Sequence, residues 1–386
     1  MKLIALALLA FATPATAQLD VQITNLPATT PKDATIYIAG SFNRWNPAAA
    51  GFRLSERQVS GFAITLPDSV RGPIEFKFTL GSWETVETGS SGDDIANRSF
   101  VVPRTGAATY ATTVEGWRDP ATATARVPSA SASVSVLSTD FEMPQLGRTR
   151  RIWIYLPPEY ARTKKSYPVL YMHDGQNVFD DATSFAGEWG VDEALDSLST
   201  RASGSIVVAI DHAGDKRLDE YSPWKHERYG GGEGAAYVEF IVRTLKPYVD
   251  KHYRTRRAAA HTAIAGSSMG GLISLYAALE HPNVFSKAGV FSPALWIAPD
   301  LVTHARERGA HFGRGAKRPK LYFVSAESEA QLKEQLAISG PLMEALAAIG
   351  YQPGKDLTVI ERPDGAHSEW FWRREFPAAY LWLFGR

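Results

Sequence analysis

The chain has 386 residues, and its 41 Lys and Arg side chains balance 41 Asp and Glu side chains. This zero net charge argues against a nucleic-acid-binding protein, because such proteins usually carry a strong basic excess. Its length and its 45% content of hydrophobic residues predict two globular domains, each able to bury a core. The sequence contains no cysteine, which excludes disulfides, thiolate nucleophiles, iron–sulfur clusters and cysteine-ligated zinc.

The first 17 residues are typical of a signal peptide. Lys2 supplies the initial positive charge, residues 3–12 form a short apolar run, and Ala15-Thr16-Ala17 matches a small-residue cleavage site. The run is shorter than the about 20 apolar residues that span a bilayer, although an uncleaved signal anchor is the alternative. We therefore expect a mature chain that begins near Gln18, is periplasmic or secreted, and has no membrane anchor.

Residues 18–118 are predicted to form a small all-β domain. Short alternating runs at residues 35–39, 61–66 and 74–79 are separated by turn residues, and no helical apolar stripe occurs among them. This pattern is typical of a small immunoglobulin-like sandwich. Residues 119–133 are rich in Ala, Thr, Ser and Pro without periodicity, so we interpret them as an interdomain linker.

Residues 134–386 change to an α/β pattern, in which continuous apolar segments alternate with stretches of helical periodicity. The predicted strands are 152–156, 169–172, 206–210, 263–265, 288–291, 321–324 and 357–360, and the predicted helices lie near 190–199, 235–250, 269–280, 330–348 and 370–384. This alternation predicts a doubly wound, mostly parallel sheet with helices on both faces. Ligands of such sheets bind beyond the carboxyl ends of the strands, where we expect the functional residues.

A G-x-S-x-G motif follows one of these strands. Gly266-Ser267-Ser268-Met269-Gly270 lies between the strand 263–265 and a helix whose apolar residues recur as one stripe. A tight strand-to-helix turn of this kind needs small neighbours and presents its serine hydroxyl at the helix N-terminus. Ser268 is therefore the predicted nucleophile, and the alternative is a serine that only caps the helix.

A serine nucleophile needs a base and an acid, which in this fold follow it in the order Ser, acid, His. His367 follows the last predicted strand and precedes the C-terminal helix, so it is the predicted base; the other histidines after Ser268 have less suitable positions. The acid should follow the strand 321–324, where position alone does not choose between Glu327 and Glu329.

Acyl transfer also needs two donors for the developing oxyanion. The backbone N–H of Met269, directly after the nucleophile, is the first expected donor. The second should come from the loop after the strand 169–172, where we assign the N–H of Gln176 and expect Gly175 to let the backbone approach a bound carbonyl.

The second domain resembles the esterase D and enterochelin-esterase-like group of α/β-hydrolases, which includes feruloyl and acetylxylan esterases. The matching segments are residues 150–160 (RRIWIYLPPEY), 171–180 (YMHDGQNVFD), 207–211 (VVAID), 217–223 (RLDEYSP), 266–271 (GSSMGG) and 365–369 (GAHSE). The resemblance implies Ser268 as nucleophile and His367 as base. It selects Glu329 over Glu327, because the acid of this group usually stands three residues after a small residue, here Ala326 in place of the usual Gly.

The first domain resembles the glycogen- and starch-binding β-sandwich modules. The matching segments are residues 39–47 (AGSFNRWNP), 74–78 (IEFKF), 81–83 (GSW) and 97–98 (NR). The resemblance implies a sugar-stacking platform of Trp45, Trp83 and Lys77, and thus contact with a glucan. The alternative is that these tryptophans belong to the core of the sandwich.

Other candidates carry less information. His173-Asp174 and Asp211-His212 lie at strand ends, but nothing supplies a third ligand at diagnostic spacing, so we predict no metal site and no cofactor. Trp296 and Trp370 could line a substrate pocket or belong to the core.

These observations together predict a secreted serine esterase that removes feruloyl or acetyl groups from carbohydrate. The alternatives are an esterase that acts on a siderophore, or a carbohydrate-binding protein on a hydrolase scaffold that no longer reacts.

Overall fold

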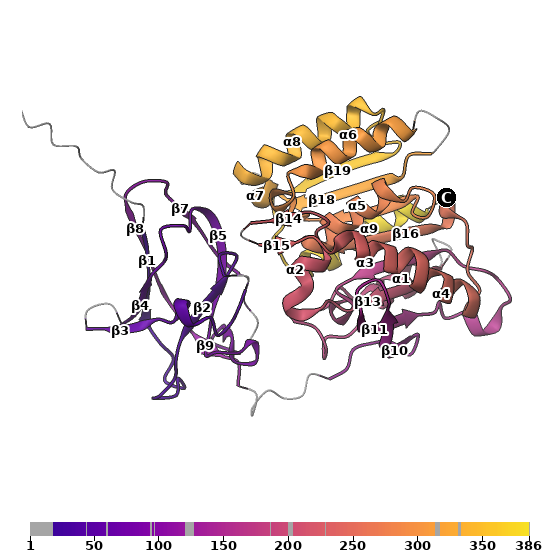
Figure 1. Ribbon diagram of the computed structural model, residues 1–386. Coiled ribbons are helices and arrows are strands. Elements are labelled where there is room, and N and C mark those ends of the chain that lie inside the picture. Colours follow the sequence, from indigo (N-terminus) through magenta and orange to yellow (C-terminus); the bar gives the residue numbers. More distant parts are fainter. Residues whose placement is uncertain are drawn as a thin grey trace, which may run out of the picture. The chain divides into compact units, whose positions relative to one another are not determined.

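The computed structural model describes residues 18–385 apart from 44, 59–60, 93–94, 96, 120–126, 186, 200–203, 228, 313–316 and 331–332. The predicted signal peptide and residues 120–126 of the predicted linker lie outside the described residues. The chain divides into two compact units, Met1–Ala123 and Thr124–Arg386, which are drawn in indigo to purple and in magenta to yellow (Figure 1).

The first unit is all β where it is described, as expected. A sheet of order β3-β4-β1-β8 and one of order β2-β5-β7 enclose a core that includes Ile38, Phe76 and Phe78. The short strands β6 and β9 pair with each other. The strands are β1 (Gln18–Asn25), β2 (Tyr37–Gly40), β3 (Ser55–Arg57), β4 (Gly61–Thr65), β5 (Gly72–Thr79), β6 (Glu87–Thr88), β7 (Arg98–Val102), β8 (Ala107–Thr113) and β9 (Gly116–Trp117).

The second unit is built on a mostly parallel sheet, which confirms the predicted fold class. Its order over the described residues is β10-β11-β13-β12-β16-β17-β18-β19, with antiparallel pairing at β10–β11 and β11–β13 and parallel pairing from β13 onward. The strands are β10 (Val134–Met143), β11 (Arg148–Tyr155), β12 (Val169–His173), β13 (Ile206–Ile210), β16 (Thr262–Ser267), β17 (Lys287–Phe291), β18 (Lys320–Ala326) and β19 (Leu357–Arg362). A separate ribbon pairs β14 (Lys225–His226) with β15 (Gly230–Gly231).

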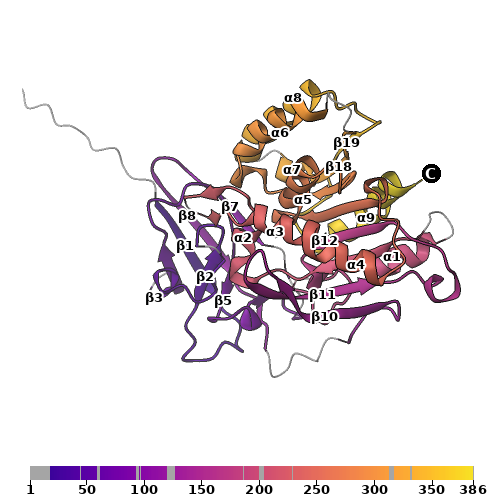
Figure 2. The ribbon, with the colours of Figure 1, turned by 45° about the vertical axis from the view of Figure 1, so that its right-hand side comes forward.

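Helices cover both faces of this sheet (Figures 1 and 2). Side chains of one strand alternate between two cores: Tyr171 packs into the core shared with α3, α4, α5, α6 and α8, whereas Met172 packs into the core shared with α1 and α9. The helices are α1 (Val191–Leu198), α2 (Arg217–Glu220), α3 (Gly234–Phe240), α4 (Lys246–His252), α5 (Met269–Glu280), α6 (Asp300–Phe312), α7 (Glu327–Ala330), α8 (Lys333–Ala348) and α9 (Glu369–Phe384). Among the described residues no helix is long and apolar enough to cross a membrane.

Three of the longer elements of the second unit differ from the sequence-based expectation. Helix α5 is buried on every side from Met269 to Leu279 rather than along one stripe, because it lies between the sheet and its neighbouring helices. Helix α6 occupies a polar, arginine-rich stretch in which no helix was expected, since only a narrow set that includes Leu301 and Ala305 is buried. Strand β10 was also missed, because it lies at the sheet edge and remains largely exposed.

The described end of the predicted linker is hydrogen bonded to the second unit. The Ser129 N–H donates to Asp180 Oδ1 at 3.0 Å, and the Ser131 N–H donates to Asp192 Oδ2 at 2.7 Å. Residues 129–131 are therefore attached to the second unit and do not form a free spacer.

Candidate active site

Ser268 occupies a strained turn between β16 and α5. Its backbone has φ 56° and ψ −120°, a conformation that non-glycine residues rarely adopt. The turn is held by the Ser268 N–H, which donates to the carbonyl of Phe291, and by the Ser268 carbonyl, which accepts from the N–H of Ala294 at 3.1 Å. The Ser268 side chain makes no capping hydrogen bond to α5. The interpretation of this residue as a simple helix cap therefore has no support.

The glycines of the motif are needed because backbones approach closely at the turn. A Cβ atom on Gly266 would lie 2.9 Å from the carbonyl carbon of Gly270, closer than real Cβ contacts come. A Cβ atom on Gly270 would lie 3.2 Å from Asp174 Oδ2. The turn after β16 is thus packed against the loop after β12, which holds the predicted oxyanion donor Gln176.

His367 and Glu329 meet at the carboxyl ends of β19 and β18. The imidazole Nδ1 of His367 lies 3.5 Å from Glu329 Oε2, and both side chains are mostly buried. The edge of the His367 ring packs on the indole of Trp372, whose Nε1 donates to the hydroxyl of Ser292 at 3.0 Å. Glu327, the other candidate acid, is exposed at the start of α7.

Gln176 lies in a tight turn of residues 174–177 that directly follows β12. Asp174 has a left-handed backbone (φ 56°, ψ 48°), which reverses the chain so that Gly175-Gln176-Asn177 forms one 3₁₀ turn. Gly175 is required for packing, because its Cβ would lie 2.8 Å from the carbonyl carbon of Ile210. We expected the missing side chain of Gly175 to let a bound carbonyl approach. In the structure it instead allows the backbone at the end of β13 to pack against this turn.

The turn is anchored from α2 by an ion pair. Arg217 donates to Asp174 Oδ1 at 2.6 Å and to Oδ2 at 2.9 Å. The hydroxyl of Tyr221 accepts from the backbone N–H of Asp174 at 3.1 Å. Burial opposes ionisation of Asp174, but the guanidinium of Arg217 outweighs it and the pKa of the carboxyl is lowered. Glu220, one residue before Tyr221, pairs instead with Arg148 and Arg150.

The model of the esterase family matches residues 143–383, well over half of the chain. The chain belongs to the esterase family. This membership makes the protein a carboxylic ester hydrolase, and its second unit has the mostly parallel, helix-covered sheet of an α/β-hydrolase.

Two curated relatives show how far the similarity extends. The esterase is 26% identical over 249 residues to the uncharacterised protein YbbA of Bacillus subtilis, a match that covers 61% of this chain and 93% of YbbA. It is also 42% identical over 95 residues to an alpha-amylase of Niallia circulans, which corresponds to 25% of this chain and only 7% of the amylase.

Two solved structures share the fold of the esterase. A ferulic acid esterase matches with a TM-score of 0.50 and 21% identity, covering 65% of this chain and 96% of its own. The enterobactin esterase FES of Shigella flexneri matches with a TM-score of 0.52 and 16% identity, covering 95% of this chain and 92% of its own. At these identities the likeness concerns the fold alone.

The histidine–aspartate pairs that were considered for a metal have other partners in the esterase. Burial lowers the pKa of His173 to about 3, which keeps it neutral, and its Nδ1 lies 2.8 Å from the hydroxyl of Tyr237. Asp211 accepts hydrogen bonds from Arg151 and Trp153. The part of the chain that the structure describes contains no group of three or more His, Asp or Glu side chains placed to hold a metal ion.

The two tryptophans proposed for a substrate pocket lie near the site on different elements. Trp296 is half-buried two residues after Ala294, which is bonded to Ser268, and its ring packs edge-on against Tyr229 at 5.0 Å. Trp370 lies in the first turn of α9, three residues after His367, and half of its surface is exposed. Neither is a fully buried core residue.

Sequence reasoning missed Trp372, Asn177 and Glu369, whose roles depend on contacts between distant segments.

In the first unit the three predicted sugar-binding residues are not equivalent. The half-buried rings of Trp45 and Trp83 lie 6.2 Å apart at an interplanar angle of 40°. Lys77, by contrast, is 3% exposed, and its Nζ donates to the carbonyl of Ile95 at 2.6 Å. The expectation that Lys77 lies on an accessible platform is therefore wrong, because its ammonium group is used to hold the backbone at residue 95.

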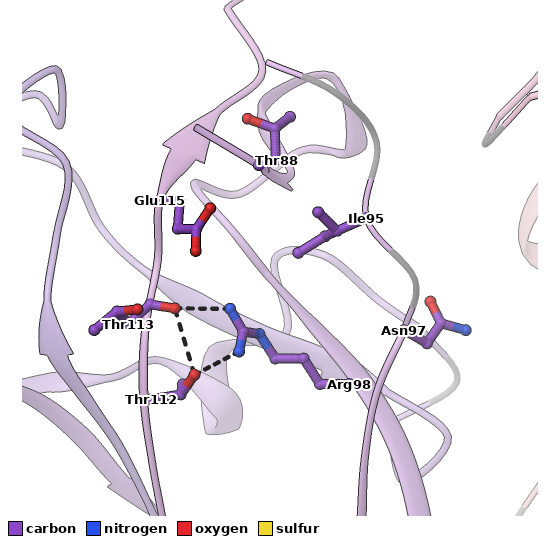
Figure 3. Close-up of a pocket in the computed structure, with 8 residues that line it drawn as sticks. Thr88, Ile95, Asn97, Arg98, Thr112, Thr113 and Glu115 are labelled. Atoms are coloured by element: carbon purple, nitrogen blue, oxygen red, sulfur yellow. Dashed lines mark hydrogen bonds between the residues drawn. The ribbon is translucent and has the colours of Figure 1, made fainter. Parts of the chain in front are cut away.

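The first unit also contains a cavity of about 320 Å³ (Figure 3). Neither Trp45 nor Trp83 is among the residues that line it. Its one cationic side chain, Arg98, donates to Thr112 and Thr113 and forms an ion pair with buried Glu87. The charge of Arg98 is thus neutralised inside the unit. The lining residues are Thr88, Gly89, Ile95, Asn97, Arg98, Thr112, Thr113 and Glu115.

Proposed function

We propose that the esterase cleaves esters with a triad of Ser268, His367 and Glu329. The observation that carries the proposal is the approach of Glu329 Oε2 to His367 Nδ1 at 3.5 Å. A carboxylate at Nδ1 holds the imidazole in the orientation and tautomer that leave Nε2 as the proton acceptor for a serine hydroxyl. The strained backbone of Ser268, whose side chain makes no helix-capping bond, supports its role as the nucleophile.

The proposed reaction proceeds in two balanced steps. Ser268 Oγ attacks the ester carbonyl carbon while His367 Nε2 takes its proton, and the N–H groups of Met269 and Gln176 receive the oxyanion. The alcohol leaves with that proton, and an acyl-enzyme remains. Water then attacks the acyl carbon, gives its proton to His367 and releases the carboxylic acid as the proton returns to Ser268.

We propose that the substrate is a feruloyl or acetyl ester of a carbohydrate. Trp296 and Trp370 support an aromatic or sugar-contacting surface beside the site, since Trp296 lies two residues after Ala294, which is hydrogen bonded to Ser268, and Trp370 lies three residues after His367. Hydrolysis of a siderophore ester is the second candidate. Its support is that the fold of the enterobactin esterase matches across nearly the whole chain.

A comparison of substrates tests this choice. The esterase should hydrolyse methyl ferulate or acetylated xylan with a kcat/KM at least about tenfold above that for a cyclic catecholate trilactone, a preference of about 1.4 kcal/mol in transition-state binding. Product release is followed by chromatography, with the Ser268→Ala protein as the blank. A preference for the trilactone would replace the carbohydrate proposal with the siderophore one.

We further propose that the first unit binds glucan through Trp45 and Trp83. Flat indole rings can cover the apolar face of a pyranose, and the short distance between these two rings supports a shared platform. The 42% identity over 95 residues to an alpha-amylase also supports contact with an α-glucan.

Trp83→Ala should weaken retention by soluble starch at least about tenfold in affinity electrophoresis, since loss of an aromatic anchor typically costs more than 1 kcal/mol of binding. Val101→Ala, which changes an exposed apolar residue of the same unit, is the matched control. Equal retention of both variants and the parent protein would show that these tryptophans do not bind glucan.

We also propose that the esterase is exported to the periplasm or medium after cleavage before Gln18. The composition of residues 1–17 supports this location. Export would bring the enzyme to polymeric or extracellular esters.

A further inference from the structure

A buried carboxylate links the two loops that the proposed mechanism uses. Glu369 is the first residue of α9, two residues after His367, and it is buried. Its Oε1 accepts a hydrogen bond of 3.2 Å from the side-chain amide of Asn177. Asn177 directly follows Gln176, the proposed second oxyanion donor. One side-chain contact therefore joins the loop of the base to the turn of the oxyanion hole.

Asn177 is held by two further hydrogen bonds. Its Oδ1 accepts from the N–H of Phe185 at 3.0 Å, and its backbone carbonyl accepts from the N–H of Trp189 at 2.8 Å. On the other side of Gln176, Arg217 holds Asp174. The turn of residues 174–177 is thus fixed at both ends, and Glu369 is the only one of these anchors, among the described contacts, that comes from the segment carrying His367.

Burial and neighbouring charges set the protonation of the Glu369 carboxyl. Burial raises the pKa of its carboxyl to about 7, even though its own backbone N–H and the His367 imidazole favour the ionised form. The other charged groups that act on it are Asp174, which disfavours its ionisation, and Arg217, which favours it. Below pH 7 the carboxyl is therefore mostly protonated, and its carbonyl oxygen can still accept from Asn177.

We propose that Glu369 is a positioning residue that keeps the oxyanion turn and the catalytic base in register through Asn177. Glu369 itself does not touch the reacting atoms; it acts through its hydrogen bond with Asn177. The inference rests on the proposed function, because it takes His367 as the base and Gln176 as a donor.

The test compares Glu369→Ala and Glu369→Gln on a soluble nitrophenyl ester between pH 5 and 9. We expect Glu369→Ala to lower kcat about 10- to 100-fold with little change in KM, as loss of a supporting residue does when it affects only the geometry of the transition state. Glu369→Gln keeps an oxygen for Asn177, so most of kcat should return. Because the carboxyl of Glu369 has a pKa of about 7, the uncharged Gln matches its main form below pH 7, and the acid limb should stay close to that of the parent protein.

Glu361→Gln removes a carboxylate at an exposed position of β19 and serves as the charge-matched control. A role in stability alone would lower the Tm of Glu369→Ala and leave the kcat of the folded protein unchanged. The inference is overturned if Glu369→Gln loses as much kcat as Glu369→Ala, or if Glu369→Ala has the kcat of Glu361→Gln. Loss of all activity in Ser268→Ala with unchanged Glu369 variants would reject only this inference, whereas activity in Ser268→Ala would reject the proposed function itself.

Discussion

Ser268→Ala should lower kcat for a soluble ester by about six orders of magnitude, the cost of removing the nucleophile from a working serine triad. The hydroxyl is the atom that forms the acyl-enzyme, and no neighbouring group can replace it in that step. The backbone at Ser268 keeps φ 56° in either protein. Since Ala meets the same strain as Ser there, the fold should be retained.

Ser267→Ala provides the matched control within the same motif. Ser267 is buried at the end of β16, one residue before the nucleophile. Its replacement should change kcat by less than about tenfold. Initial rates and covalent labelling by a fluorophosphonate, read as a mass increase, check both variants. Labelling of Ser268→Ala at the rate of the parent protein would remove Ser268 from the mechanism.

Glu329→Gln should lower kcat by about four orders of magnitude, the second-largest effect expected of a single side chain here. An amide at this position can donate a hydrogen to His367 Nδ1 and so favours the tautomer that cannot accept the serine proton. The loss should lie in kcat rather than in KM, because the substrate does not touch Glu329 in the proposed mechanism.

Glu327→Gln is the natural comparison, since the two carboxylates lie within one turn of α7 and differ in exposure. This variant should keep kcat within about threefold of the parent protein, as substitutions of exposed side chains usually do. A steady-state measurement with one soluble ester decides between them. The reverse ranking would make Glu327 the acid and would require α7 to turn relative to its position in the structure.

Much of the esterase domain could be predicted because its strands are buried on both faces. A strand such as β13 is apolar at every position, so its limits, residues 206–210, are recognisable without its neighbours. The motif around Ser268 was equally visible, since a tight turn between a strand and a helix requires glycine at fixed positions. Helix α6 was missed for the converse reason, because most of its surface faces solvent and its buried residues are few.

The amino-acid sequence by itself determined the order of the strands and helices, the nucleophile turn and the candidate residues at strand ends, because these depend on local conformation and on the period of apolar residues. Only the tertiary structure decided which distant side chains meet. It brought Glu329 to His367, Glu369 to Asn177 and Arg217 to Asp174, and it buried Lys77. Such pairs join segments up to almost 200 residues apart. Whether two such side chains meet depends on how the whole sheet packs, and no local sequence pattern records it.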